Sequence, residues 1–472
     1  MSSSRRFSVD LEKVMKISVK IFGLMLGLPL LAIAGQFEVS EFKLNNGLKV
    51  LVKEDHRAPV VVSQVWYKIG SSYEHDGITG ISHMLEHMMF KGTEQHPAGE
   101  FSRIIAANGG SENAFTGEDF TAYFQSLEKS RLEVSFKLEA DRMRYLKVDE
   151  GEFAKERDVV LEERRLRTED QPRDKTMELF MALAFSNGPH KNPVIGWPED
   201  IKEYTLSDLQ KWYRQWYAPN NATVVVVGDV QPEAVHDLAQ KYFGVLAPSR
   251  LPKLKSRTEL DQTGLRRMIV KRPAKLPFLV MGYKVPVLKD AVKEWEPYAL
   301  EVLTGILDGG NGARLPSRLV RGKQIAAEAN VGYNLYSRLS TLLMIEAVPA
   351  QDHDTVALEQ ALREEIRQLQ EKPVAPEELA QVKAQVVAHK VYEQDSGFYQ
   401  AMQLGMLETV GLSWSKVEEY VDKVKAVTPE QVRIVARKYL VEDRLSIAYL
   451  DPLPITDDTT TAETLLENTH AH

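Results

Sequence analysis

The stretch Ile78-Thr-Gly-Ile-Ser-His83-Met-Leu-Glu86-His87-Met-Met-Phe-Lys-Gly92 sets two histidines and one glutamate among apolar residues. On a helix, residues four positions apart lie one turn above each other, so His83 and His87 would project two imidazoles from one face. Glu86 would point to nearly the same side. Two neutral imidazoles at this spacing suit zinc, and a carboxylate beside them suits a general base.

The order His-x-x-Glu-His is the inverse of the commoner His-Glu-x-x-His and occurs among the inverted zinc-peptidase signatures. The alternative interpretation is two surface histidines on an amphipathic helix. With 11 histidines in the chain, a chance match is expected in on the order of a few per cent of such sequences. The pattern therefore predicts His83 and His87 as metal ligands and Glu86 as the catalytic base.

Composition excludes some partners and some kinds of metal ligand. The chain has 472 residues and a net charge of −8, which favours neither nucleic acid nor an anionic membrane as a partner. Cysteine is absent, which excludes disulfides, thiolate ligands and a cysteine nucleophile. A zinc site in this chain must be built from histidine and carboxylate.

The N-terminus has the pattern of a secretory signal peptide. Lys16 and Lys20 precede an apolar run over residues 21–33, and Ala32-Ile-Ala34 provides a small-residue cleavage site. We expect residues 1–34 to be removed and the mature protein to be periplasmic, with no membrane contact after cleavage. An uncleaved membrane anchor is the alternative, and a start at Met15 would make residues 1–14 an upstream extension.

The chain also resembles itself. Residues 205–217, followed by the apolar run Thr223-Val-Val-Val-Val227, have a counterpart in residues 428–440, followed by Ser446-Ile-Ala-Tyr449. Each begins with a threonine at a helix N-cap and turns from an amphipathic helix into a strand. A repeat of this size predicts two domains of one fold. We place them at residues 35–250 and 265–452, with a polar, proline-punctuated boundary between them and a disordered tail over residues 453–472.

A catalytic zinc usually has three protein ligands and an open position. The predicted helix over residues 150–168 offers Glu152, Glu156, Glu162 and Glu163. Glu156 and Glu163 are seven residues apart and share a helix face, but the residues alone do not choose between Glu162 and Glu163.

These motifs together resemble one family. His83-x-x-Glu86-His87, followed by Glu156-Arg-x-Val-Val-x-x-Glu163, is similar to the pitrilysin/insulysin family of zinc peptidases, which includes the mitochondrial processing peptidase. The similarity is greatest to its short bacterial two-domain members. It implies an α+β fold of two homologous domains, each a mixed or antiparallel sheet covered by helices. In the second domain, residues 299–307 would form the matching helix without the metal motif.

The resemblance assigns further roles. It makes Glu163 the third ligand of one Zn²⁺ per chain and gives Glu156 a supporting position beside the ligands. Asn113 and Ala114, on an expected edge strand over residues 111–116, would bind peptide by strand addition. A plain turn at Gly109-Gly110-Ser111, satisfied by Asn113, is the alternative interpretation.

The implied activity is zinc-dependent endopeptidase cleavage of peptides or unfolded segments by a zinc-bound water, with Glu86 as general base. In the family a second half supplies an Arg and a Tyr seven residues apart, but Glu328 stands seven residues after Arg321 here. We therefore expect a homologous partner subunit that carries the Arg/Tyr pair, or a homodimer. The alternative function is a non-catalytic peptide-binding or assembly subunit that retains zinc.

Overall fold

The computed structural model describes residues 38–255 and 258–455, and the elements below lie in these ranges. The predicted signal peptide, residues 1–34, lies outside the described residues. So does the predicted tail, residues 453–472, beyond its first three positions.

The N-terminal half, residues 39–242, is built on a six-stranded mixed sheet in the order β1-β2-β6-β3-β5-β4. Its strands are β1 (Val39–Lys43), β2 (Lys49–Glu54), β3 (Val60–Tyr67), β4 (Ser111–Thr116), β5 (Thr121–Glu128) and β6 (Ala222–Gly228). Only β2 and β6 pair in parallel. All seven residues of β6 are buried, as expected for a central strand with both faces covered.

Eight helices belong to this half: α2 (Ile81–Met88), α3 (Glu100–Ala107), α4 (Leu132–Tyr145), α5 (Glu150–Arg164), α6 (Pro172–Ala184), α7 (Pro198–Glu203), α8 (Leu206–Trp216) and α9 (Pro232–Tyr242). The predicted helix over residues 150–168 is α5 followed by a π-helical turn, Arg165–Glu169. The core between sheet and helices includes Tyr67, Met84 and Met88. The motif helix α2 is therefore part of the main core.

The C-terminal half, residues 266–453, repeats this plan with one strand fewer. Its sheet has the order β7-β11-β8-β10-β9, from β7 (Arg266–Pro273), β8 (Phe278–Val285), β9 (Ala326–Gly332), β10 (Thr341–Pro349) and β11 (Leu445–Leu453). Its helices are α10 (Trp295–Asp308), α11 (Thr355–Glu371), α12 (Pro376–Glu393), α13 (Gly397–Val410), α14 (Lys416–Ala426) and α15 (Pro429–Tyr439). β7 and β11 pair in parallel, as β2 and β6 do.

The repeated helix is capped alike in both halves. Thr205 and Asp208 form a capping box at the start of α8, and Thr428 and Gln431 form one at the start of α15. α8 leads to β6, which pairs in parallel with β2, and α15 leads to β11, which pairs in parallel with β7. The predicted fold class, two homologous α+β domains with helix-covered sheets, is confirmed.

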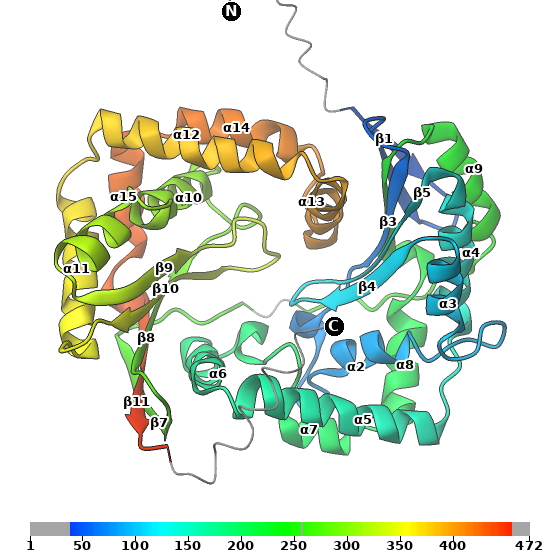
Figure 1. Ribbon diagram of the computed structural model, residues 1–472, viewed down its shortest axis with the longest axis horizontal. Coiled ribbons are helices and arrows are strands. Elements are labelled where there is room, and N and C mark those ends of the chain that lie inside the picture. The colour runs from blue at the N-terminus through cyan, green and yellow to red at the C-terminus, as the bar shows by residue number, and fades with distance from the viewer. Residues whose placement is uncertain (1–37, 256–257, 456–472) are drawn as a thin grey trace, which may run out of the picture. The chain divides into compact units, whose positions relative to one another are not determined.

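Each sheet receives a helix from the other half (Figure 1). α13 of the C-terminal half lies against β3 and β6, where an added Cβ on Gly405 would lie 2.2 Å from the Trp66 indole nitrogen. In return, α6 of the N-terminal half lies against β7, β8 and β11, and Phe180 enters the core of the second sheet. The two halves are thus joined by reciprocal packing as well as by the connecting chain.

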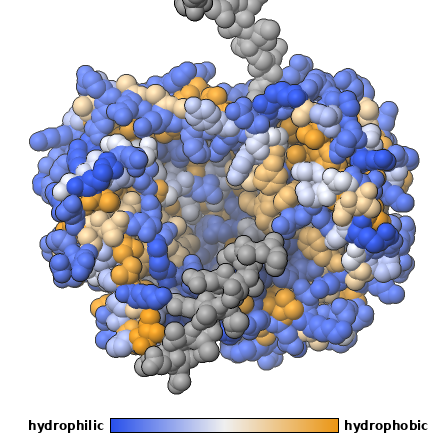
Figure 2. All heavy atoms as spheres, in the orientation of Figure 1, coloured by the Kyte–Doolittle hydropathy of each residue, from blue (hydrophilic) through white to orange (hydrophobic). Residues whose placement is uncertain are grey.

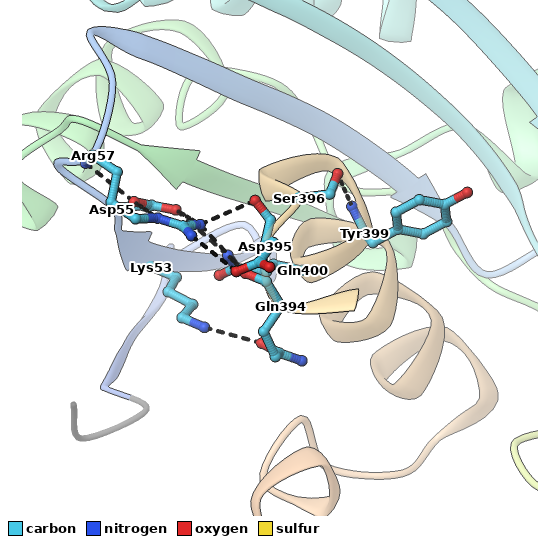
Figure 3. Close-up of polar contacts among 8 residues, drawn as sticks. All are labelled: Lys53, Asp55, Arg57, Gln394, Asp395, Ser396, Tyr399 and Gln400. Atoms are coloured by element: carbon cyan, nitrogen blue, oxygen red, sulfur yellow. Dashed lines mark hydrogen bonds and ion pairs between the residues drawn. The ribbon is translucent and has the colours of Figure 1, made fainter. Parts of the chain in front are cut away.

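Polar contacts add to this packing. Arg57, which follows β2, donates to the backbone oxygens of Gln394 (3.3 Å) and Asp395 (3.2 Å) between α12 and α13 (Figure 3). The surface in the orientation of Figure 1 is hollowed near its centre and has a mainly hydrophilic rim (Figure 2). The edge strand β4 borders this central region in Figure 1.

Candidate metal centre

The N-terminus of α2 is fixed by a carboxylate from the preceding segment. Glu74 accepts the backbone N–H groups of Gly80 (2.7 Å) and Ser82 (2.8 Å), which no helical carbonyl can reach. Gly80 has φ 85°, in the left-handed region that favours glycine. The buried side chains of α2 pack on the core, which leaves its polar side chains for the site.

Three side chains of α2 and α5 offer ligand atoms to one point. One atom each of His83, His87 and Glu163 lies within 4.8 Å of the others. Glu163 Oε2 is 3.2 Å from His87 Nε2 and 3.8 Å from His83 Nε2. The motif predicted His83 and His87 as ligands, and the resemblance added Glu163. The fold brings Glu163 to both histidines, although it stands 76 residues after His87.

The donor atoms fit a cation. Glu163 Oε2 is buried and has no partner in hydrogen-bonding geometry among the described residues. A buried carboxylate oxygen left in this way is costly unless a positive group compensates it. Two imidazoles and a carboxylate are the ligand set that suits a catalytic zinc.

The structure distinguishes Glu162 from Glu163 as the candidate third ligand, a choice that the residues alone did not decide. The other oxygen of Glu163, Oε1, is 2.6 Å from the guanidinium of Arg167, which directs Oε2 toward the histidines. Glu162 instead points to solvent and forms an ion pair with Arg165 at 2.6 Å. Glu163 is therefore the residue that reaches the site.

Glu156 contacts a ligand histidine directly. Its Oε1 is 2.9 Å from His87 Nδ1, and its Oε2 is 2.5 Å from Lys91 Nζ. A carboxylate at Nδ1 fixes the ring orientation and leaves Nε2 for a metal. His83 Nδ1 is buried and has no such partner within the described ranges.

Burial and neighbouring charges set the protonation of the site. Burial, with the His87 imidazole beside it, lowers the pKa of His83 to about 4, so His83 is neutral at neutral pH. The adjacent His87 is the main cause of a lowered pKa at Glu163. Burial alone would lower the pKa of His87, but the carboxylates of Glu163 and Glu156 outweigh it and raise that pKa.

Glu86 lies next to this ligand set without belonging to it. Its Oε2 accepts a short hydrogen bond from Thr116 Oγ1 at the end of β4. Burial raises the pKa of Glu86, the direction that favours proton transfer near neutral pH. Thr116 ends the edge strand expected over residues 111–116, but no pattern in the sequence places it beside Glu86.

The predicted peptide-binding residues lie on an edge strand. β4 is the last strand of its sheet and pairs with β5 on one side only. Asn113 is exposed and its Oδ1 accepts the N–H of Ala114, which is half-buried. Because the free edge of β4 continues into Thr116, a strand added there would run toward Glu86.

Two charged residues of the site escaped the sequence analysis. Lys91 and Arg167 each stand four residues after a site residue, His87 and Glu163. Residues four apart on a helix meet, so this spacing is the signal that could have found Arg167. Lys91 lies beyond the end of α2 and contacts Glu156 instead.

The C-terminal half has no tyrosine at the expected position. Arg321 donates to the backbone oxygen of Asn311. Glu328 on β9 lies 3.5 Å from the guanidinium of Arg173 on α6. The Arg/Tyr pair implied by the resemblance is incomplete in this chain.

Comparison with known proteins agrees with this site. Residues 49–197 match the family model described as Insulinase (Peptidase family M16), and residues 203–386 match the Peptidase M16 inactive domain. The chain belongs to peptidase family M16. The candidate metal site lies in the first of these regions, and the second contains Arg321 and Glu328.

Two similar proteins are named zinc proteases, and a similar solved structure is named a protease. Zinc protease PqqE of Helicobacter pylori is 38% identical over 293 residues, which span 61% of this chain and 64% of that protein. The uncharacterized zinc protease YmxG of Bacillus subtilis is 25% identical and is matched over 98% of its length, or 88% of this chain. A crystal structure of a protease from Helicobacter pylori superposes with a TM-score of 0.83 at 30% identity, covering 88% of this chain and 100% of that one.

Within residues 38–255 and 258–455, no helix combines the length and apolar character needed to cross a membrane.

Proposed function

We propose that this protein is a zinc-dependent endopeptidase that hydrolyses peptides or unfolded segments. The observation that carries the proposal is the convergence of His83, His87 and Glu163 within 4.8 Å, with Glu86 on the same helix as both histidines. The family membership and the zinc-protease names of the relatives support it.

Each residue has a separate task. His83, His87 and Glu163 would hold one Zn²⁺, which supplies Lewis acidity toward a carbonyl and a water molecule when bound. Glu86 accepts the proton of the attacking water and delivers it to the leaving amine. Thr116 holds the Glu86 carboxylate, and Glu156 holds the His87 ring.

The free edge of β4 supports a peptide substrate in extended form. Asn113 and Ala114 would bind it through main-chain hydrogen bonds, which give affinity without demanding a sequence. We propose that a homologous subunit supplies the missing tyrosine, since Glu328 takes its place here. The alternative is a homodimer of this chain, which would work without that tyrosine. A periplasmic location rests on the sequence pattern of residues 1–34, and cell fractionation with N-terminal sequencing tests it.

The test combines zinc binding with turnover. Wild type is expected to bind one zinc, and Glu86→Gln to keep it while peptide hydrolysis falls at least about 100-fold, because the base is lost. Glu163→Ala is expected to weaken zinc binding by more than about 100-fold, and the neighbouring Glu162→Ala to leave it unchanged. Equal zinc affinity in the two alanine variants would refute the ligand assignment.

One outcome would favour a different function. A chain that binds one zinc but hydrolyses no peptide, alone or with a homologous partner, would be a non-catalytic peptide-binding or assembly subunit. The incomplete Arg/Tyr pair is the observation that supports a non-catalytic function as the alternative.

A further inference from the structure

Arg338 of the C-terminal half contacts two segments that adjoin the candidate metal site. Arg338 lies in the loop between β9 and β10. Its backbone N–H and its Nε donate to the Asp119 carboxylate at 2.9 and 3.1 Å. Its terminal nitrogen donates to the hydroxyl and the backbone oxygen of Ser72 at 2.6 and 3.1 Å.

These contacts are buried and mutually dependent. Asp119 is 4% exposed, and it also accepts the Ser72 hydroxyl at 2.6 Å. The Arg338 guanidinium lies 4.2 Å from the centre of the Tyr73 ring. A buried carboxylate that loses its cation is left uncompensated, and Arg338 is the cation paired with Asp119. The hydroxyls of Ser72 and Ser337 add to its hold on this carboxylate.

Asp119 belongs to the turn that connects β4 to β5. The turn is closed by Gly117 N–H to Phe120 O at 2.8 Å, and Ser72 N–H donates to Glu118 O at 2.7 Å. There is no space between the two segments, because a Cβ on Gly70 would lie 2.3 Å from Gly117 O. The turn and residues 70–73 therefore form one unit, and Arg338 binds both parts of it, at Asp119 and at Ser72.

Both ends of this unit lead to the metal centre. On one side, Thr116 directly precedes the turn, and its hydroxyl holds Glu86. On the other side, Glu74 directly follows Tyr73 and holds the first N–H groups of α2, which carries both histidines. A displacement of the unit would shift the base and the edge strand together.

We propose that Arg338 is a positioning residue for peptide hydrolysis: from the metal-free half, it fixes the β4–β5 turn and thereby the place of Glu86 and of the substrate-binding edge. The inference rests on the proposed function. It gives the metal-free half a direct role in the chemistry of this chain, separate from the Arg/Tyr pair.

A second arginine provides the matched control. Arg57 also joins the two halves, through Gln394 and Asp395 (Figure 3). Its side chain is 56% exposed, against 17% for Arg338. Its hydrogen bonds and ion pairs go to Asp55, Gln394 and Asp395, and none goes to the turn or to α2. Arg57→Gln removes a contact between the halves without touching the proposed unit.

The first experiment compares kcat and KM per zinc-loaded molecule in wild type, Arg338→Gln and Arg57→Gln, well below their melting temperatures. Arg338→Gln is expected to lower kcat about tenfold with zinc content unchanged, because small misplacements of a catalytic group are costly. Arg57→Gln is expected to stay within about twofold, and Arg338→Lys to recover part of the loss. Equal kcat in Arg338→Gln and Arg57→Gln would overturn the proposal.

A double-mutant cycle tests the route through Thr116. If Arg338 acts by way of the Thr116 hydroxyl, the loss of kcat in Arg338→Gln/Thr116→Val is smaller than the product of the single losses. Full multiplicativity would exclude this route. Absence of hydrolysis by wild type, both alone and with a homologous partner, or persistence of hydrolysis in Glu86→Gln, would refute the proposed function instead.

Hydrogen exchange provides a readout that needs no turnover. The Gly117 N–H, bonded to Phe120 O, is expected to exchange at least about tenfold faster in Arg338→Gln than in Arg57→Gln. Asp119→Asn, which keeps the side-chain shape, serves if Arg338→Gln does not fold. Unchanged protection of Gly117 in a folded Arg338 or Asp119 variant would contradict the proposal.

Discussion

His87 is the proposed ligand whose ring orientation is best defined. Its Nδ1 is 2.9 Å from Glu156 and its Nε2 is 3.2 Å from Glu163, so the two nitrogens have different roles. Lys91, at 2.5 Å, holds the second oxygen of Glu156. The imidazole is thereby turned toward the metal position before any ion arrives, which raises metal affinity.

This arrangement predicts the effect of removing Glu156. Glu156→Ala is expected to weaken zinc binding by about 10- to 100-fold, because the Nδ1 side of His87 loses its partner. Glu152→Ala is the control, since Glu152 lies one turn earlier on α5 and its side chain bonds to Lys155. Calorimetric zinc titration measures both, and equal affinities would show that Glu156 does not orient His87.

For single residues, the sequence predicted contacts within one helix but not contacts between elements. The spacing of His83, Glu86 and His87 is a property of one helix, and the sequence contains it directly. The choice between Glu162 and Glu163 depends on how α5 is rotated against α2, which tertiary packing decides. The contact of Thr116 with Glu86 depends on the register of β4 and β5, and no local pattern encodes it.

Among the connecting elements, the segment between the halves is held by Glu259. Its carboxylate accepts the backbone N–H groups of Ser186 (3.0 Å), Asn187 (2.9 Å) and Gly188 (2.6 Å). It also pairs with Lys284 of β8 at 2.6 Å. One side chain therefore ties the connection to the chain after α6 and to the second sheet.

Glu259 predicts a pH-dependent contribution to stability. Burial alone would raise its pKa, but Lys284 and the three N–H groups outweigh burial and lower the pKa from 4.5 to about 2. A lowered folded-state pKa stabilises the protein above pH 4.5, and this stabilisation is lost as the pH falls toward 2. Glu259→Gln is expected to lower the unfolding free energy by about 2 kcal/mol at pH 7.

Urea unfolding of wild type and Glu259→Gln across this pH range measures the contribution. The difference between them is expected to shrink as the pH falls below 4.5. Asp261→Asn, at an exposed site nearby, is the control and is expected to change stability by less than about 0.5 kcal/mol. A difference for Glu259→Gln that does not vary with pH would exclude the charge as its cause.

In the whole molecule, the repeat and the family fold were predictable from the sequence. The packing of α6 and α13 on the sheet of the opposite half was not. Similar segments such as α8 and α15 reveal two copies of one plan. They contain no information about which sheet receives α6 or α13, because equivalent helices would fit either sheet. The packing of Gly405 on Trp66 and of Phe180 on the second sheet is a long-range result of folding.

Gly405→Ala tests this packing between the halves. The added Cβ would lie 2.2 Å from the Trp66 indole nitrogen. Helix propensity alone would favour alanine by about 1 kcal/mol, yet overpacking is expected to prevail and to destabilise the protein by about 1–2 kcal/mol. Gly151→Ala, at an exposed position of α5, is the control and is expected to be neutral or stabilising. A thermal shift of the same sign in both variants would contradict the close contact.

The most direct test of the proposed function is hydrolysis of a quenched fluorescent peptide library by the purified chain, alone and with a homologous partner subunit, before chelation, after chelation and after zinc is restored. We expect cleavage that chelator abolishes and zinc restores, and that is absent from zinc-loaded Glu86→Gln. Cleavage that survives chelation, or that zinc-loaded Glu86→Gln retains, would contradict this function.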